Sequence, residues 1–391
     1  MSNYHISIDL GTTTLAFSDN LGSSFTSINH QAAFGADVVS RIKASCEGHG
    51  PLLSDIIKKD LSFGITQLKE CSKLSSDTPA AITIAANTAM THLFMNYDCH
   101  GLAAYPFAPV TLEAICTSAD ILSQPGTLTL LPGASAFIGG DILSGLLFLD
   151  ADTWEKPCLL LDLGTNAEMV LGTREQLFSA SAAAGSALEG GGISCGIGGV
   201  KGAICHINLD KVPSFQTIDY GRPLGICGTG ILDLTAELLS HNYLDETGLL
   251  SEPYFSEGYP VTKAYGAQKA ITFTQSDVRQ IQMAKSAVCT GIELLCQEAG
   301  ILAKEIEHVY LAGTLGTKIV PVNAARIGLF PETFCSRIVP SGNTSLSGAS
   351  LYASAPEQSL KRIKKIRNSI TCLELANHLE FQKLFISHMN F

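Results

Sequence analysis

Two short turns with the same residues, one in each half of the chain, most constrain what this sequence can fold into. "HISIDLGTTTLAF" begins at His5 and "LLLDLGTNAEMVLG" begins at Leu159. In each, an apolar strand runs into Asp-Leu-Gly-Thr, starting at Asp9 and Asp162. One such turn is an ordinary strand-to-hairpin corner. Two of them, about one lobe apart, predict duplicated halves whose hairpins face each other across a cleft.

The residue types in these turns favour phosphate binding. Glycine lets the main chain approach a ligand closely, so that backbone N–H groups reach phosphate oxygens, and threonine hydroxyls add donors. An aspartate only accepts hydrogen bonds when ionised, so it suits a position beside a divalent cation or an attacking water. The chain has neither G-x-x-x-x-G-K-[ST] nor G-x-G-x-x-G. The repeated turns are therefore the predicted polyphosphate site.

Composition excludes several classes of protein. A length of 391 residues predicts two to three domains or two lobes, and 46% hydrophobic with 16% charged residues describes a well-cored globular protein. A net charge of −11 argues against a nucleic-acid partner. We expect no signal peptide, no membrane segment and a cytoplasmic location. The 12 cysteines, none in a C-x-x-C pair, are expected to be buried reduced thiols.

Hydrophobic patterning locates the main elements. We expect a strand ending near Ala85 and then a helix, and a loop leading into an amphipathic helix in "AFIGGDILSGLLFLD". Cys158 to Leu161 reads as a strand buried on both faces. Apolar residues recur every three or four positions from Val278 to Ala299, which predicts a long helix stopped by Gly300. The basic run "SLKRIKKIRNSI" favours a solvated helix face over a docking patch for an acidic partner.

The order of elements resembles the actin, sugar-kinase and heat-shock-chaperone ATPase superfamily. Its first phosphate motif matches 9–14, its second matches 162–168 and its adenosine motif matches "VYLAGTLG", 309–316. Its two connecting helices match "GGDILSGLLFL" and "GNTSLSGASLY". The resemblance implies an α/β fold of two duplicated ribonuclease-H-like lobes with a nucleotide cleft between them. It places the first lobe at 1–153, the second at 154–356 with a Gly-rich insertion, and a C-terminal extension at 357–391.

Longer phrases narrow the resemblance. "NHQAAFGADVVSRI", "GGGISCGIGG", "GICGTGILDLTAELL", "AKSAVCTGIELL" and "SGNTSLSGA" are similar to the ATPase region of the reductive activators of corrinoid proteins. Those activators use ATP to drive an electron onto Co(II) of a corrinoid-dependent methyltransferase, giving Co(I). The resemblance implies ATP and Mg²⁺ as cofactors and a corrinoid protein or methyltransferase as partner. It also allows a homodimer.

The resemblance assigns roles to residues of the two turns. Asp9 and Asp162 would orient Mg²⁺, through water. Asp141, before the first connecting helix, is the candidate base for the attacking water, with a helix N-cap as the alternative. Both turns would contact the outer phosphates, through Gly11, Thr12, Thr13, Thr14, Gly164, Thr165 and Asn166.

Five further residues receive roles or alternatives. Gly313 and Gly316 would let adenine and ribose lie against the backbone, and Lys285 would flank the adenine or be solvated. Glu168 is a supporting partner or a surface residue, and Asn343 is interpreted as a helix cap rather than a ligand. The adenosine motif departs from the family pattern, because Gly313 is followed by threonine and leucine where a second glycine is expected.

The cysteines raise the question of an iron–sulfur cluster. Family members carry a separate plant-type domain with a C-x4-C-x2-C run, and that spacing does not occur in this sequence. We therefore expect a separate ferredoxin-like protein to supply electrons. Cys195 and Cys227 lie in glycine-rich turns. They are interpreted as packed thiols, so no cluster is expected in this chain, the alternative being a cluster bridging two subunits as in dehydratase activators.

Three functions follow from these residues. The favoured one is an ATPase that reactivates a corrinoid protein. The second is a small-molecule kinase of the same fold, with Asp141 deprotonating a substrate hydroxyl. The third is a nucleotide-gated regulatory module that does not hydrolyse ATP, which the altered adenosine motif would favour.

Overall fold

The computed structural model describes residues 4–263 and 270–391, which form two compact units. The first comprises residues 1–155, 173–177 and 343–372, and the second comprises 156–172, 178–342 and 373–391. The units interleave along the chain, because the segment from Asn343 to Cys372 returns to the first unit. The lobe boundaries after residues 153 and 356, which were inferred from the sequence, stay a prediction.

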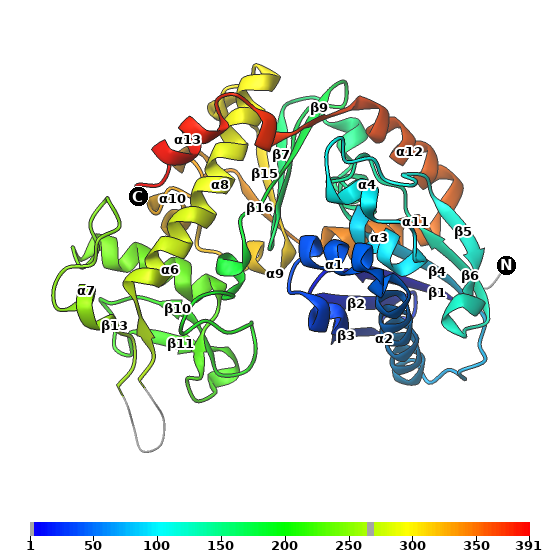
Figure 1. The fold of residues 1–391 in the computed structure, drawn as a ribbon, viewed down its shortest axis with the longest axis horizontal. Coiled ribbons are helices and arrows are strands. Elements are labelled where there is room, and N and C mark those ends of the chain that lie inside the picture. Colours follow the sequence, from blue (N-terminus) through cyan, green and yellow to red (C-terminus); the bar gives the residue numbers. More distant parts are fainter. Residues whose placement is uncertain (1–3, 264–269) are drawn as a thin grey trace. The chain divides into compact units, whose positions relative to one another are not determined.

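The first unit is built on a mixed sheet with the strand order β3-β2-β1-β4-β6-β5 (Figure 1). Strands β1, β2 and β3 pair antiparallel, whereas β1, β4 and β6 run parallel. The central strands β1 and β4 are buried along most of their length. Because they run parallel, their carboxyl ends meet at the same edge of the sheet. The strands are β1 (His5–Leu10), β2 (Thr14–Asp19), β3 (Ser24–Ile28), β4 (Ala80–Ala86), β5 (Ile115–Ser118) and β6 (Gly126–Leu130).

Helices cover this sheet, and two of them, α5 and α11, pack directly against each other. The expected strand before Ala85 and the helix after it are confirmed as β4 and α3, and the amphipathic helix after the loop is confirmed as α5. The helices are α1 (Val38–Ala44), α2 (Gly50–Cys71), α3 (Thr88–Met95), α4 (His100–Ala103), α5 (Gly140–Phe148), α11 (Thr344–Ser354) and α12 (Pro356–Ser369).

The second unit repeats the plan of hairpin and parallel strands, in the order β16-β15-β7-β8-β9. Strand β7 pairs antiparallel with β8 and parallel with β15. The expected strand at Cys158 is confirmed as β7, whose first four residues are all buried. The strands are β7 (Cys158–Leu163), β8 (Ala167–Gly172), β9 (Leu177–Ala182), β15 (His308–Ala312) and β16 (Ile338–Gly342). The Gly-rich region and the segment after it add β10 (Ala203–Ile207), β11 (Phe215–Thr217), β12 (Gly225–Ile226), β13 (Tyr259–Pro260) and β14 (Thr272–Phe273). Strand β17 (Ile370–Leu373) falls where the chain passes from the first unit to the second.

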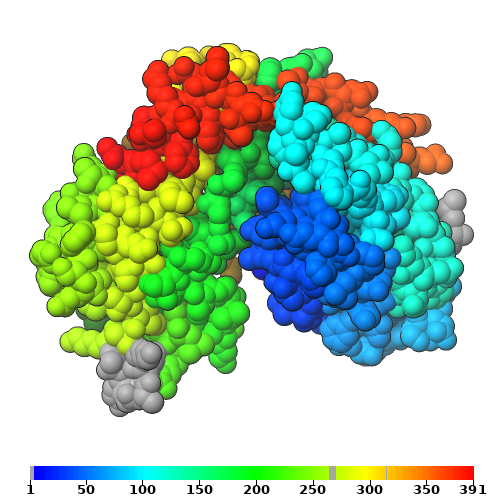
Figure 2. Space-filling model, viewed as in Figure 1, coloured from blue at the N-terminus to red at the C-terminus, as the bar shows by residue number. Residues whose placement is uncertain are grey.

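The long helix α8 (Gln275–Ala299) confirms the helix predicted from the three-to-four spacing. Thr274 and Asp277 form a capping box at its start, and Gly300 ends it in the left-handed conformation with φ 64°. The C-terminal helix α13 packs along α8, and Figure 2 shows the red C-terminal segment against the yellow surface of α8. The other helices of this unit are α6 (Gly228–Ser240), α7 (Tyr254–Glu257), α9 (Gly313–Gly316), α10 (Pro321–Arg326) and α13 (Phe381–Ser387).

One expectation about buried residues changes. Cys71, Cys116 and Cys372 are exposed, so the expectation that the thiols are buried is wrong for these three. It holds in full for Cys99, Cys158 and Cys227, and the other six cysteines are half-buried. The three exposed cysteines lie at a helix end or on short strands, where the alternation of side chains turns a residue outward. No helix in the described ranges is long and apolar enough to cross a membrane.

The basic run lies on α12, and part of it is already paired within the first unit. Arg362 bonds Asp150 at 2.7 Å and Asp152 at 2.6 Å. Arg367 pairs with Glu113 at 2.7 Å, and the Lys365 Nζ donates to the backbone of Asp152. These contacts hold α12 on its own unit, because bidentate arginine–carboxylate pairs are among the stronger surface interactions.

Candidate functional site

Asp9 lies at the end of β1 and is held by two donors from α11. The Asn343 Nδ2 donates to its Oδ2 at 2.7 Å, and the Ser345 Oγ donates to its Oδ1 at 2.8 Å. The N-terminus of α11 therefore points at the carboxylate, which a helix N-terminus stabilises. Burial nevertheless raises the pKa of Asp9, against the lowering effect of these two hydrogen bonds.

Asn343 has two functions, of which sequence reasoning found one. Its Oδ1 accepts from the Leu346 N–H at 2.8 Å, which confirms the helix cap. Its amide nitrogen is the donor that reaches Asp9, so the same side chain joins the second connecting helix to the first phosphate motif. Neither this contact nor that of Ser345 was predicted.

The crossing of α5 and α11 places these donors. The Ser144 Oγ donates to the Ser345 carbonyl at 2.8 Å. A Cβ added to Gly348 would lie 1.9 Å from the Ser144 carbonyl oxygen, and one added to Gly145 would lie 2.8 Å from the Thr344 hydroxyl. Only glycine fits at these two positions, and this close approach sets the depth at which Ser345 meets Asp9.

The turn after Asp9 is fixed by two asparagines that sequence reasoning missed. The Gly11 N–H donates to the Thr14 carbonyl at 3.2 Å, and the Asn29 Nδ2 donates to the Gly11 carbonyl at 3.0 Å. The Asn87 Nδ2 donates to the Thr12 Oγ1 at 3.3 Å. Asn87 could have been found, because it directly follows β4, whose carboxyl end lies beside that of β1.

Asp141 lies at the start of α5, at the same edge of the sheet. A Cβ on Gly139 would be 2.4 Å from the Asn87 Cα, so the α5 N-terminus touches the residue that holds Thr12. The N-cap of α5 is Gly139, and Asp141 follows it in the first turn. The N-cap interpretation of Asp141 is therefore wrong, because the helix begins two residues earlier than that interpretation required. Its role as base stays a prediction.

The second turn is shorter by one residue. Between the paired residues Leu163 and Ala167 lie Gly164, Thr165 and Asn166, and the Gly164 N–H donates to the Asn166 carbonyl at 3.0 Å. In the first turn four residues lie between the paired Leu10 and Leu15. Both turns thus expose a glycine and a hydroxyl directly after an acidic strand end.

Carboxylates gather around the second turn. Asp162 lies directly opposite Glu168 across the β7–β8 pair, and the Glu189 Oε2 accepts from the Thr165 Oγ1 at 2.7 Å. The Ser181 Oγ donates to Glu168 at 3.4 Å. Like charges on opposed residues of a sheet repel, so a cation near this pair would stabilise it. Glu189 was not predicted, since the glycines around it masked its position in a single-turn helix.

The adenosine motif meets Asp162 across two parallel strands. Ala312 pairs with Asp162, and a Cβ on the next residue, Gly313, would lie 3.0 Å from the Asp162 Oδ1. Gly313 has φ 78°, a conformation that favours glycine. Residues Gly313–Gly316 form one turn of helix, α9. Leu315, which stands where the family pattern differs, is buried, and its Cδ1 would lie 3.2 Å from a Cβ added at Gly228. The absence of a side chain at Gly228 therefore makes room for Leu315, the residue that departs from the family pattern.

Lys285 lies on α8 beneath the C-terminal residues. Its Nζ donates to the Asn390 carbonyl and lies 5.3 Å from the centroid of the Phe391 ring. Burial lowers the pKa of Lys285 to about 8. The alternative of a solvated lysine is wrong, because Lys285 is 1% exposed. Its proximity to adenine stays a prediction.

The two cysteine-bearing turns lie side by side. The Ile226 N–H donates to the Cys195 carbonyl at 2.8 Å, next to Cys227, whose Sγ lies 3.5 Å from the Thr229 Oγ1. Burial raises the pKa of Cys195 to about 12. A protonated, half-buried thiol is typical of packing rather than of a ready metal ligand.

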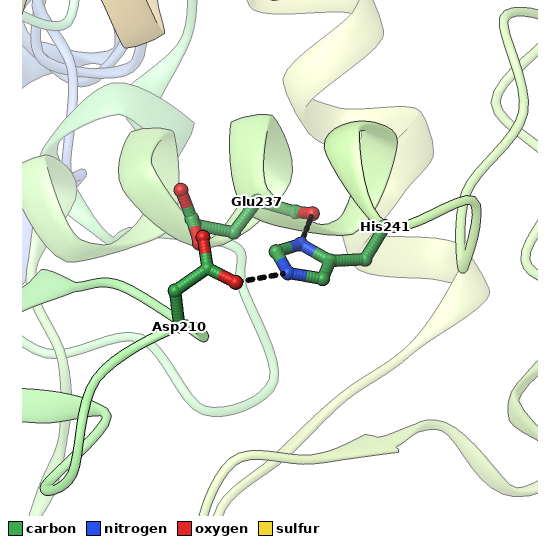
Figure 3. Close-up of side chains that lie close together, drawn as sticks. All are labelled: Asp210, Glu237 and His241. Atoms are coloured by element: carbon green, nitrogen blue, oxygen red, sulfur yellow. Dashed lines mark hydrogen bonds and ion pairs between the residues drawn. The ribbon is translucent and has the colours of Figure 1, made fainter.

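A cluster of possible cation ligands was not predicted: Asp210, Glu237 and His241 (Figure 3). The His241 Nδ1 donates to the Glu237 carbonyl at 2.8 Å, and its Nε2 lies 3.1 Å from the Asp210 Oδ1. The backbone hydrogen bond to Glu237 and the side chain of Asp210 raise the pKa of His241. An imidazolium paired with Asp210 accounts for this geometry, so the cluster fastens the end of α6 to the loop after β10.

Comparison with known proteins gives a consistent match along the chain. The model of the C-terminal domain of RACo, the ASKHA domain, matches residues 156–391, and the model of the RACo middle region matches residues 4–153. The corrinoid activation enzyme RamQ of Eubacterium limosum is 31% identical, with 99% of this chain and 70% of RamQ covered. A [Co(II) methylated amine-specific corrinoid protein] reductase of Methanosarcina barkeri is 30% identical over 55% of this chain and 42% of that protein.

A solved structure agrees with these relatives. The reductive activator for corrinoid, iron-sulfur protein has a TM-score of 0.90 and 28% identity, and it covers 100% of this chain. This chain in turn covers 66% of that structure, so it corresponds to part of the longer protein. The expected actin-like α/β fold class is confirmed by these matches.

Proposed function

The chain belongs to the RACo family of corrinoid-protein activators, and from this membership we propose that it is an ATP-hydrolysing activator that drives a corrinoid protein from Co(II) to Co(I). The family match supports nucleotide binding and a role in activation. The hydrolysis, the metal and the electron source belong to the proposal. The observation that carries it is the repetition, in each unit, of a strand ending in aspartate followed by a glycine-containing turn.

The residues present suit Mg·ATP. Asp9 and the carboxylates near Asp162 offer the oxygen ligands that Mg²⁺ prefers, and Mg²⁺ keeps several waters when bound by few carboxylates. Asp9 is oriented by Asn343 and Ser345, so its free lone pairs can accept from metal-bound water. Backbone N–H groups and hydroxyls of Thr12 and Thr165 would donate to phosphate oxygens.

Asp141 would orient the attacking water. It follows the glycines that bring α5 against Asn87, at the sheet edge that also carries Asp9 and Thr12. A carboxylate at such a position accepts a proton from water as the bond to the outer phosphate forms. Loss of that phosphate would remove the contacts to the threonine turns and change the conformation seen by the partner.

The test combines hydrolysis with cobalt reduction. The protein is mixed with a Co(II) corrinoid protein, Mg·ATP and a chemical reductant, and Co(I) absorbance and phosphate release are followed. We expect Co(I) to appear only with ATP and phosphate release to rise with corrinoid protein. A ferredoxin-like protein that has been reduced beforehand should replace the chemical reductant. The variant Asp9→Asn should abolish both signals.

Other outcomes would replace the proposal. Phosphorylation of a small hydroxyl compound from a substrate panel would identify a kinase. Tight ATP binding without hydrolysis, in folded protein, would identify a regulatory module. ATP-independent formation of Co(I) would remove the nucleotide from the mechanism.

A further inference from the structure

An apolar cavity of about 530 Å³ lies beside the C-terminal half of α8. Ile292, Ile301, Leu302 and Pro331 form much of its wall, and Cys289, Glu293 and His388 supply polar atoms. All these residues belong to the second unit. Among the described residues, the lining includes none of those assigned to the phosphate turns. Apolar cavities with a few converging polar groups are typical of small-molecule sites.

The polar atoms form a thiol–imidazole–carboxylate chain. The His388 Nε2 lies 2.7 Å from the Glu293 Oε2, and the His388 Nδ1 lies 3.6 Å from the Cys289 Sγ. An ionised carboxylate only accepts, so the Nε2 carries the hydrogen and donates to Glu293. The Nδ1 is then the acceptor for the Cys289 S–H. This is the arrangement in which a base can take the proton of a nucleophile while a third group orients the base.

The tail of the chain holds His388 in place. The Ser286 Oγ donates to the Phe385 carbonyl, and the Gln282 Nε2 donates to the Met389 carbonyl at 2.7 Å. These bonds fix the residues on both sides of His388 against α8. Cys289 and Glu293 are four residues apart on the same helix, so they share the face that His388 covers.

An inert core thiol beside a histidine–glutamate ion pair is the simplest alternative. Burial raises the pKa of Cys289 to about 11, with Lys285 lowering it and Glu293 raising it. A free thiolate is therefore scarce at neutral pH, and an unassisted Cys289 would react slowly. A reaction at this thiol therefore requires that its proton pass to His388. Dependence of the reaction rate on His388 distinguishes an activated thiol from an inert one.

We propose that Cys289 is a site of S-thiolation by small uncharged disulfides, with His388 as the base. The Cys289 proton passes to the His388 Nδ1 as the sulfur attacks one sulfur of the disulfide. The disulfide bond of the small molecule breaks, and its leaving thiolate takes the proton from His388. Cys289 is oxidised to a mixed disulfide, and one sulfur of the small molecule is reduced to a thiol.

The cavity selects the class of disulfide. Its walls are apolar, and among the lining residues Glu293 supplies a carboxylate without a lysine or arginine beside it, so anionic disulfides are disfavoured. Cys296 also lines the cavity, seven residues along α8. That spacing is about 10 Å of helix rise, beyond the roughly 7 Å Cα separation that a disulfide tolerates. The adduct would therefore persist until an external thiol reduces it.

The experiment uses the full chain and bis(2-hydroxyethyl) disulfide at neutral pH. Peptide mapping by mass spectrometry gives the rate of adduct formation at each cysteine. We expect Cys289 to react faster than Cys296, which shares the cavity, and His388→Asn to slow Cys289 by about tenfold or more. The rate at the exposed Cys71 should not change. Glutathione disulfide, which is anionic, should react more slowly at Cys289 relative to Cys71.

A second variant is needed because His388→Asn could slow the reaction simply by displacing the C-terminal segment from α8. Glu293→Gln keeps the size of the side chain and can still accept from the His388 Nε2–H, but it removes the charge that stabilises the imidazolium. It should slow Cys289 several-fold with the cavity intact. The proposal is overturned if Cys289 reacts no faster than Cys296, or if both variants leave its rate unchanged or raise it.

Discussion

Asn343 donates from its Nδ2 to the Oδ2 of Asp9 at 2.7 Å, across 334 residues of sequence. The bond ties the second connecting helix to the first phosphate motif within one compact unit. Asp9 is thereby oriented by α11 of its own unit, and its pKa is raised because burial outweighs its two donors. A buried carboxylate of this kind destabilises the folded state when it is ionised, and a cation that binds beside it offsets this destabilisation.

Replacing Asp9 with asparagine should therefore separate activity from stability. The pKa of Asp9 is raised in the folded state, so protonation favours folding, and stability is lost as pH rises through the folded pKa. At neutral pH the neutral amide avoids this cost, so we expect the free energy of unfolding of Asp9→Asn to equal or exceed that of the unmodified protein. Phosphate release should fall at least about 100-fold. Urea titrations and phosphate assays check both.

Asp55→Asn is the matched control, since Asp55 lies on the exposed face of α2 in the same unit. It should change neither quantity. A destabilised Asp9→Asn with normal hydrolysis would contradict the assignment of Asp9.

The α5–α11 crossing should not tolerate a methyl group at Gly348. The added Cβ would lie 1.9 Å from the Ser144 carbonyl oxygen, and a backbone atom cannot rotate away. We expect Gly348→Ala to lower the free energy of unfolding by about 2 kcal/mol or more. It should also weaken ATP binding, because displacement of α11 moves Ser345 away from Asp9. Denaturant titration and nucleotide titration measure the two effects.

Gly198→Ala is its control, because a Cβ there meets nothing within 4 Å. Equal losses of stability in the two variants would show that the crossing is not the cause.

The local part of the fold and site could be predicted from the sequence. Helix α8 follows from the spacing of its apolar residues and Gly300, and the strands before Asp9 and Asp162 follow from short apolar runs ending at glycine turns. These signals are local, since helix and strand periods act over neighbouring residues. Asn87 was also within reach, because it follows a strand parallel to β1.

The remaining site contacts depend on long-range packing. Ser345 reaches Asp9 only because Gly145 and Gly348 let two helices cross closely, and nothing in either segment alone specifies that depth. Lys285 is likewise covered by Asn390 and Phe391, which are about a hundred residues away in sequence. A sequence pattern gives the helix face of a residue, but not the distant segment that covers it.

Cys195 and Cys227 should not bind an iron–sulfur cluster in this chain. Burial holds the Cys195 thiol protonated, with its pKa raised to about 12, whereas cluster ligation requires thiolates. After anaerobic incubation with iron and sulfide, we expect substoichiometric iron and no charge-transfer absorption in the visible range. The double variant Cys195→Ser, Cys227→Ser should give the same spectrum. Stoichiometric iron that this variant loses would establish a cluster and overturn the expectation.

Lys285 should make stability depend on pH in the alkaline range. Its pKa is lowered by burial to about 8 in the folded state from 10.5. Below pH 8 both states hold the proton, and the folded state carries the full cost of a buried ammonium. Between about pH 8 and 10.5 the unfolded state binds more protons, so the free energy of unfolding should rise with pH, by up to about 3 kcal/mol. Lys285→Met removes the titrating group while filling the space, so this rise should disappear.

Urea titrations of both proteins between pH 7 and 10 give the difference between their free energies of unfolding. The contributions of the other titrating groups are the same in both proteins and cancel in this difference. Lys304→Met, at an exposed lysine, should follow the unmodified protein. Parallel profiles for Lys285→Met and the unmodified protein would mean that the ammonium is already solvated, and that Phe391 and Asn390 do not seal it from water.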